Sequence, residues 1–101
     1  TGGGQTKVLK FVKDVHIIKD NLFELPPLFR MIQESSGTPW REMYQVFNMG
    51  HRMEIYLPAR HADAVMAIAE KYGIEARVIG RVRRAQGEKV TVKGPFGKFE
   101  Y

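Results

Sequence analysis

Cysteine is absent from the 101-residue chain, and histidine is scarce, with three residues. The lack of cysteine excludes disulfides, thiol chemistry and cysteine-ligated metals, and it suits a reducing compartment. His16 and His61 have no partners at metal-ligand spacing, so we expect no metal site. No apolar run is long enough to cross a bilayer, and the first residues show no signal-peptide pattern. We therefore expect a cytoplasmic protein without membrane contact.

Negative charge is in the minority, and the formal net charge is +5. The excess lies in residues 51–101, which hold ten Lys/Arg against six Asp/Glu, compared with six against five in residues 1–50. A basic surface can bind nucleic acid or phosphorylated metabolites, so charge alone does not choose between them. Arg77, Arg81 and Arg83 fall on one face of a predicted strand. Such a stripe is usually a solvated face, and it lacks the interleaved aromatic residues that stack bases.

The chain has no internal repeat or interdomain linker, and its apolar residues follow two periods. Spacing at i, i+3, i+4 and i+7 predicts helices, while alternation and β-branched runs predict strands. The predicted helices cover residues 5–12, 25–36, 38–47 and 62–72, and the predicted strands cover 15–20, 51–57, 75–84, 88–93 and 98–101. We expect a single α+β domain over residues 1–101, a sandwich of helices packed on a mixed or antiparallel sheet of about four strands.

Two neighbouring helix boundaries carry residues with known end preferences. Gly37 is expected to end the helix that begins near Pro26 and Pro27, because glycine readily adopts a positive φ. Thr38 is expected to cap the next helix, with its hydroxyl accepting a backbone N–H and Pro39 at the position that needs no donor. The apolar side of that helix should comprise Trp40, Met43, Tyr44 and Phe47.

A turn at residues 48–52 collects polar side chains between this helix and the next predicted strand. Gly50 suits the positive φ of a helix exit. Asn48 can orient a carbonyl or an amine, and Arg52 can meet a phosphate. The alternation places His51 on the apolar face and Arg52 on the opposite one, so Arg52 is the better anion contact. A purely structural turn is the alternative interpretation.

A glycine triplet, Gly2–Gly4, precedes the first predicted helix. Small residues let a backbone approach an anion, and a helix N-terminus offers free N–H groups and the positive end of its dipole. The triplet matches neither the P-loop nor the dinucleotide pattern, so a frayed terminus without function is the alternative. Carboxylates are scattered and no Ser/His/Asp arrangement is recognisable, so no catalytic residue is predicted.

Four stretches resemble one family when they are taken in order: "TGGG" at 1–4, "PPLFRMIQ" at 26–33, "EMYQVFNMG" at 42–50 and "VIGRV" at 78–82. Together they resemble the C-terminal domain of the phosphoribosylformylglycinamidine cyclo-ligase (aminoimidazole ribonucleotide synthetase) family. The resemblance covers the chain to about residue 83. It favours the cyclo-ligase over relatives that make selenophosphate or phosphorylate thiamine phosphate.

The resemblance implies a two-domain, homodimeric enzyme of purine biosynthesis. ATP activates the formyl oxygen of formylglycinamidine ribonucleotide, an internal nitrogen attacks, and the imidazole ring of aminoimidazole ribonucleotide closes with release of ADP and phosphate. The N-terminal domain of the family supplies most ATP and Mg²⁺ contacts and the main dimer interface. The family loop reads His-x-Thr-Gly-Gly-Gly, so this chain is expected to be a C-terminal half that starts within that loop and is inactive alone.

The family motif also implies which residues form the site. Residues Thr1, Gly2, Gly3 and Gly4 would line the cleft near a phosphate, and Asn48 and Gly50 would form part of its wall. Arg52 is a further candidate contact. Lys7 stands near the position of a family arginine in a shorter loop, and "HRM" replaces the usual apolar-Gly-Met after "FNMG". "GPFGKFEY" has no counterpart in the family.

Two functions of other classes remain open at this point. A basic α+β module could bind RNA through its sheet, which predicts salt-dependent affinity and exposed aromatic residues on a strand. Tyr56 is the only good candidate for such a residue, so we expect no nucleic-acid partner. A ligand-sensing or dimerisation module would instead predict self-association and exposed apolar patches.

Overall fold

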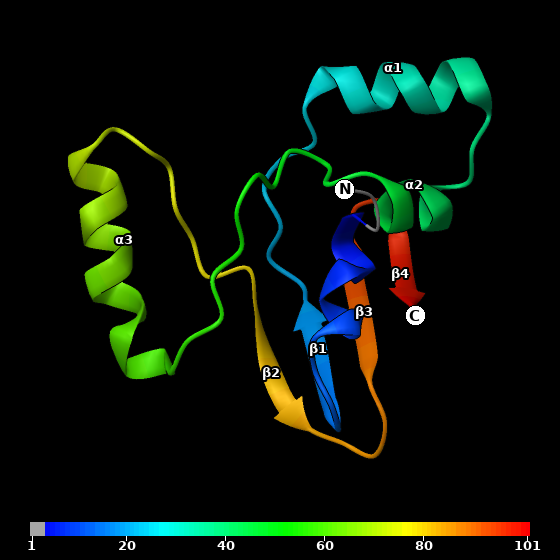
Figure 1. The fold of residues 1–101 in the computed structure, drawn as a ribbon. Helices are drawn as coiled ribbons and strands as arrows, with labels where there is room; N and C mark the ends of the chain where they lie inside the picture. Colours follow the sequence, from blue (N-terminus) through cyan, green and yellow to red (C-terminus); the bar gives the residue numbers. More distant parts are fainter. Residues whose placement is uncertain (1–3) are drawn as a thin grey trace.

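The computed structural model describes residues 4–101 and contains a four-stranded mixed sheet (Figure 1). The strands are β1 (Val15–Lys19), β2 (Gly80–Arg84), β3 (Lys89–Gly94) and β4 (Gly97–Glu100), in the spatial order β2-β1-β3-β4. Strand β1 runs parallel to β3 and antiparallel to β2, and β4 runs antiparallel to β3. The predicted α+β fold with a four-stranded sheet is confirmed.

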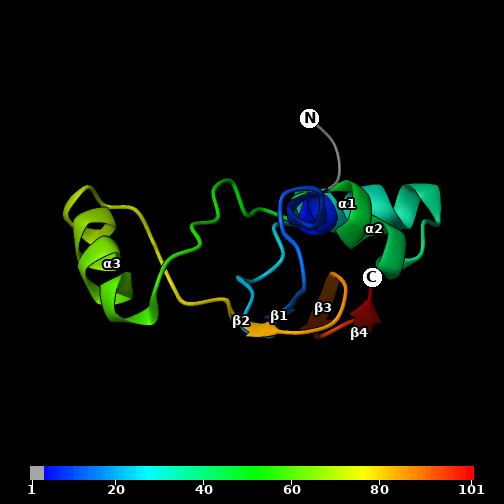
Figure 2. The same cartoon turned by 60° about the horizontal axis from the view of Figure 1, so that its bottom comes forward.

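The helical elements are the 3₁₀ helices η1 (Gly4–Lys10) and η2 (Ala59–His61) and the α-helices α1 (Pro27–Ser36), α2 (Trp40–Val46) and α3 (Ala62–Lys71). Elements η1, α1 and α2 lie over the same face of the sheet (Figure 2). Helix η1 contacts both α2 and β3, whereas the main contact of α3 is with η2. The fold therefore places the start of η1 and the end of α2 side by side above the central strands.

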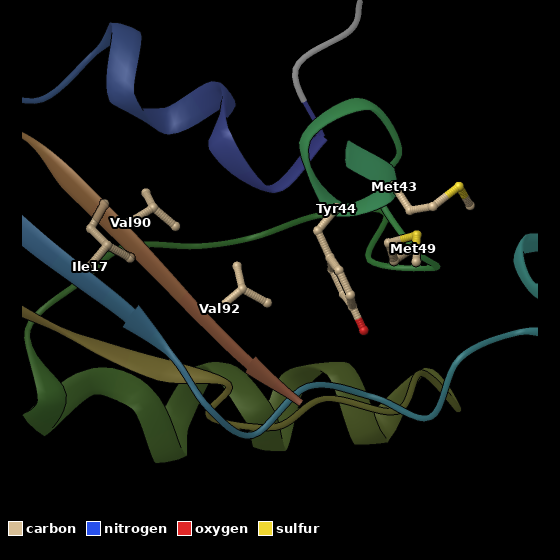
Figure 3. Packing of buried hydrophobic residues seen from close by; sticks show 6 residues of the cluster. All are labelled: Ile17, Met43, Tyr44, Met49, Val90 and Val92. Carbon is tan, nitrogen blue, oxygen red and sulfur yellow. The ribbon is translucent and has the colours of Figure 1, made fainter. Parts of the chain in front are cut away.

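The buried core lies between the central strands and α2. Alternation points Ile17 of β1 and Val90 and Val92 of β3 to the helical side, where they meet Tyr44 of α2 (Figure 3). Met49 is also buried here, just beyond the end of α2. Each fully buried side chain of this size contributes roughly 1.5–3 kcal/mol by removal from water. The core thus fixes the turn that follows α2.

One predicted helix boundary is confirmed and the other is wrong. Gly37 ends α1 with φ +70°, and its N–H donates to the Gln33 carbonyl at 2.8 Å. The predicted cap at Thr38 is not formed, because Pro39 adopts the extended cap conformation (φ −57°, ψ 144°) and α2 begins after it. The Thr38 hydroxyl instead shares a 2.7 Å hydrogen bond with the Ser36 hydroxyl.

The predicted strand over residues 51–57 is wrong, and the predicted strand over residues 75–84 is limited to β2. Alternation becomes a strand only where another strand can pair with it. Residues 51–57 pair with none of the four strands, although the outer strands β2 and β4 each keep a free edge. These residues form an irregular connection to η2, and residues 75–79 likewise connect α3 to β2.

Candidate functional site

An open cavity of about 800 Å³ lies between η1, the end of α2 and residues 51–56. Three predicted site residues line it, namely Gly4, Asn48 and Arg52, together with Lys7. Gly50 belongs to the adjoining turn but not to the lining. Thr1, Gly2 and Gly3 lie outside the described residues. The structure thus brings the start of η1 next to the turn after α2, more than 40 positions away in the sequence.

The turn after α2 is held by its own polar groups. The Gly50 N–H donates to the Asn48 side-chain oxygen at 2.9 Å, and the His51 N–H donates to the Asn48 carbonyl at 3.0 Å. Met49 and Gly50 have positive φ values of 56° and 93°. The Asn48 side chain therefore has a structural task in the turn, as the alternative interpretation predicted, while it also lines the cavity.

Gly4 is required by close packing at the cavity wall. A Cβ atom at this position would lie 2.3 Å from the Phe47 carbonyl oxygen and 2.8 Å from that of Tyr44. Both atoms belong to the backbone at the end of α2, so they cannot rotate away. This approach explains the glycine without reference to any ligand, and it joins the start of η1 to the turn.

A buried lysine forms the floor of the cavity. Lys19 is 2% exposed, and its ammonium donates to the backbone and side-chain oxygens of Gln5, both at 2.9 Å. It also contacts the two Glu54 oxygens at 3.1 and 2.9 Å. Burial lowers the pKa of Lys19, and the Glu54 carboxylate opposes this shift. The Lys19–Glu54 ion pair therefore sits where water is largely excluded.

Two further hydrogen bonds extend from this ion pair. The Tyr56 hydroxyl donates to Glu54 Oε2 at 2.9 Å, and the Gln5 side-chain nitrogen donates to the Asn48 carbonyl at 2.8 Å. Burial is the main cause that raises the pKa of Tyr56, and the Glu54 carboxylate adds to it. The phenol therefore remains protonated and serves as a donor at neutral pH.

Sequence reasoning missed the polar floor of the cavity. Gln5, Lys19 and Glu54 were not among the predicted site residues, and Tyr56 was considered only for stacking on bases. One signal was available: Lys19 shares strand parity with the buried Ile17, so alternation directs a charged side chain to the core face. A charge there requires a partner.

His51 packs beside the cavity as a neutral acceptor. It is 8% exposed, its Nε2 accepts the Phe23 N–H at 3.3 Å, and the two rings lie 5.2 Å apart. Burial is the largest cause that lowers the pKa of His51 from 6.5. Lys19 and Arg77 lower it further, while Glu54 acts in the opposite direction. His51 is buried, as its place in the alternation predicted, although residues 51–57 do not form the strand on which that prediction rested.

The free energy of unfolding should fall as the pH is lowered from 8 to 5. The pKa of His51 is lower in the folded state than the ordinary 6.5, so the unfolded chain binds more protons below pH 6.5. The contribution of His51 is complete above pH 6.5 and is lost as the pH falls toward the folded pKa, with a slope that does not exceed about 1.4 kcal/mol per pH unit. Urea unfolding at each pH measures it. His51→Gln should flatten the slope and His61→Gln should not; equal slopes in all three proteins would contradict the assignment.

Two residues of the arginine stripe form contacts within the chain. Arg77 lies over the Phe23 ring at 4.6 Å and donates to the Leu22 carbonyl at 3.1 Å. Arg81 pairs with Asp20 at 2.9 Å.

Among residues 4–101, no three His, Asp or Glu side chains lie close enough to hold a metal ion. Over the same residues, none of the helices combines the length and apolar character needed to cross a membrane.

Comparison with known proteins gives this geometry a context. Residues 1–93 match the family model described as "AIR synthase related protein, C-terminal domain". Proteins named phosphoribosylformylglycinamidine cyclo-ligase are similar: 40% identical over 96 residues in Methanocaldococcus jannaschii, 35% over 94 in Methanopyrus kandleri and 36% over 96 in Burkholderia cenocepacia. These alignments cover 92%, 93% and 91% of this chain but 27% of each relative. The chain belongs to the family of AIR synthase related proteins and corresponds to their C-terminal domain.

Proposed function

We propose that this chain is the C-terminal domain of an ATP-dependent cyclo-ligase, which converts formylglycinamidine ribonucleotide to aminoimidazole ribonucleotide in purine biosynthesis. The names of the relatives and the family match support this assignment. The main support within the chain is the cavity, because it joins Gly4 of η1 to Asn48 and Arg52 of the turn after α2. The domain alone is proposed to be inactive.

The basic rim of the cavity suits the phosphate of a ribonucleotide. Lys7 and Arg52 are exposed and both line the cavity. A guanidinium can hold phosphate through paired N–H donors, and an ammonium adds a point charge. We place the phosphate between these side chains. The residues Thr1, Gly2 and Gly3 are proposed to complete the contact from the side of Gly4, with Asn48 and Gly50 in the wall.

ATP and Mg²⁺ are proposed to bind mainly outside this chain. In the part that the structure describes, no three His, Asp or Glu side chains lie close enough together to hold a metal ion. In this proposal the N-terminal domain of the same protein supplies those contacts. The present domain contributes positioning and anion stabilisation, which are what phosphoryl transfer mainly requires from a protein.

Exposed apolar side chains support the proposed domain partner. Ile68 and Tyr72 are largely exposed on and just after α3, and Met53 and Ile55 are exposed near the cavity. Exposed apolar patches mark surfaces that meet another protein part. The N-terminal domain of the same protein is the proposed occupant, within a homodimeric, cytoplasmic enzyme.

Arg52→Met should weaken binding of formylglycinamidine ribonucleotide about tenfold, because one charge-assisted phosphate contact is lost. An NMR titration of the isotope-labelled chain measures the affinity, with shifts expected at Lys7, Asn48 and Gly50. Arg84→Met is the matched control, since Arg84 is exposed on β2. In a separate titration of the same chain, ADP with phosphate is added in place of the ribonucleotide.

A short RNA at two salt concentrations is the competing ligand in the same titration. Tighter, strongly salt-dependent binding of RNA that weakens in Arg84→Met would contradict the cyclo-ligase assignment. Equal losses of ribonucleotide affinity in Arg52→Met and Arg84→Met would remove Arg52 from the site.

A further inference from the structure

A continuous chain of hydrogen bonds runs along the floor of the cavity. It passes from the Tyr56 hydroxyl through Glu54 and Lys19 to Gln5, and from the Gln5 side chain to the Asn48 carbonyl. The links join residues 43, 14 and 35 positions apart. The η1 wall and the wall formed by residues 48–56 are therefore both connected to one ammonium group.

Lys19 cannot itself hold an anion in the cavity. Its side chain is 2% exposed, and its three N–H donors are directed to Gln5 and Glu54. Its positive charge faces the Glu54 carboxylate at 2.9 Å. Lys7 and Arg52 are by contrast exposed, and they are the cations a ligand can reach.

The backbone of Lys19 is also unusually well fixed. It lies at the end of the central strand β1, opposite Gly80 of β2 and Val92 of β3. A side chain that starts from this point reaches η1 and residues 51–56 from a rigid base. The two walls of the cavity, η1 and residues 51–56, lie outside the sheet. Hydrogen bonds to the Lys19 side chain help to fix their position relative to each other.

We propose that Lys19 is the positioning residue of the cavity. Through Gln5 it sets the start of η1 and the Asn48 turn, and through Glu54 it sets the segment that carries Arg52. The inference rests on the proposed function in one respect, namely that the positioned groups bind the phosphate of a ribonucleotide. Lys19 itself makes no contact with that ligand.

The test compares Lys19→Met with Lys19→Arg and Glu54→Gln, which keep hydrogen-bonding groups, and with Lys10→Met. Lys10 is an exposed lysine of η1 outside the cavity and is the matched control. Two properties are measured by NMR at a temperature where each protein is folded. The first, without ligand, is the exchange protection of the Gly50 amide and the position of the Gln5 side-chain amide signals. The second is the Kd for formylglycinamidine ribonucleotide.

We expect Lys19→Met to lower Gly50 protection and weaken the Kd by about tenfold each, and to shift the Gln5 signals. Lys19→Arg should restore part of each property, Glu54→Gln should show a smaller loss, and Lys10→Met should show none. A purely structural role would lower the melting temperature but leave the Kd and the Gly50 protection of the folded variants unchanged, and that result overturns the inference.

Failure of the proposed function gives a different pattern. If the wild-type chain does not bind the ribonucleotide while Gly50 and Gln5 still respond to Lys19, the positioning of the turn stands and the ligand assignment falls. If Lys19→Met does not fold, Lys19→Arg and Glu54→Gln decide in its place. Unchanged Gly50 and Gln5 signals in both would overturn the inference.

Discussion

Replacing Gly80 with alanine is expected to lower the free energy of unfolding by about 3 kcal/mol. Gly80 lies opposite Lys19 in the antiparallel pair of β2 and β1. A Cβ atom there would lie 1.9 Å from the Ile18 carbonyl oxygen and 2.9 Å from the Lys19 Cα. These are backbone atoms of the central strand, so relief requires the two strands to separate. Urea unfolding followed by circular dichroism measures the loss.

Gly73→Ala is the matched control for this prediction. Gly73 has a φ of +72°, and a Cβ atom there would meet nothing within 4 Å. Only the strain of an alanine in the left-handed region remains, about 1–2 kcal/mol. A loss in Gly80→Ala no larger than in Gly73→Ala would show that β2 does not approach β1 as closely as the structure indicates.

Lys19→Met is expected to lower the free energy of unfolding by about 3 kcal/mol, because it leaves a largely buried carboxylate and two Gln5 oxygens without their donor. Glu54 keeps 20% side-chain exposure, which limits the loss. The double variant Lys19→Met/Glu54→Gln removes both charges. It should be more stable than the sum of the two single losses predicts, by about 1–2 kcal/mol. Urea unfolding of the wild type, the two single variants and the double variant gives the four free energies of this double-mutant cycle.

The exposed Lys89–Glu100 pair provides the comparison. Its atoms lie 3.2 Å apart, yet both side chains are more than 40% exposed, at 44% and 49%. Lys89→Met should therefore leave the free energy of unfolding almost unchanged. Losses of similar size for Lys19→Met and Lys89→Met would mean that water reaches the Lys19–Glu54 pair freely.

The sequence allowed most elements to be predicted, because their signals are local. Residues 15–19 and 89–94 are β-branched runs that became the two central strands, and Gly37 ended α1 as its conformational freedom suggests. Residues 51–57 alternate just as clearly, but they can form a strand only if the fold places them beside a free sheet edge. That condition is set by residues more than 20 positions away, so no local pattern contains it.

The candidate site was predicted only at Gly4 and at the turn after α2, where a family motif marks Asn48 and the alternation marks Arg52. Asn48 and Arg52 were found in the turn, and the structure places both at the cavity, although the ligand contacts remain predictions. A further hydrogen bond to the turn comes from Gln5, whose side-chain oxygen accepts from Lys19. Glutamine and lysine are common surface residues, so their residue types do not indicate a buried site. Only the contact between them in the folded structure indicates it.

The pairing of the central strand has a consequence for folding during synthesis. Both partners of β1 lie in the last quarter of the chain, at residues 80–84 and 89–94. Contacts between such distant segments require large loops to close, which makes folding slow. A nascent chain that has not yet reached residue 80 cannot build the sheet. Until then Ile17 and Ile18 are part of an unpaired apolar segment, and it is during this interval that the chain is most exposed to aggregation.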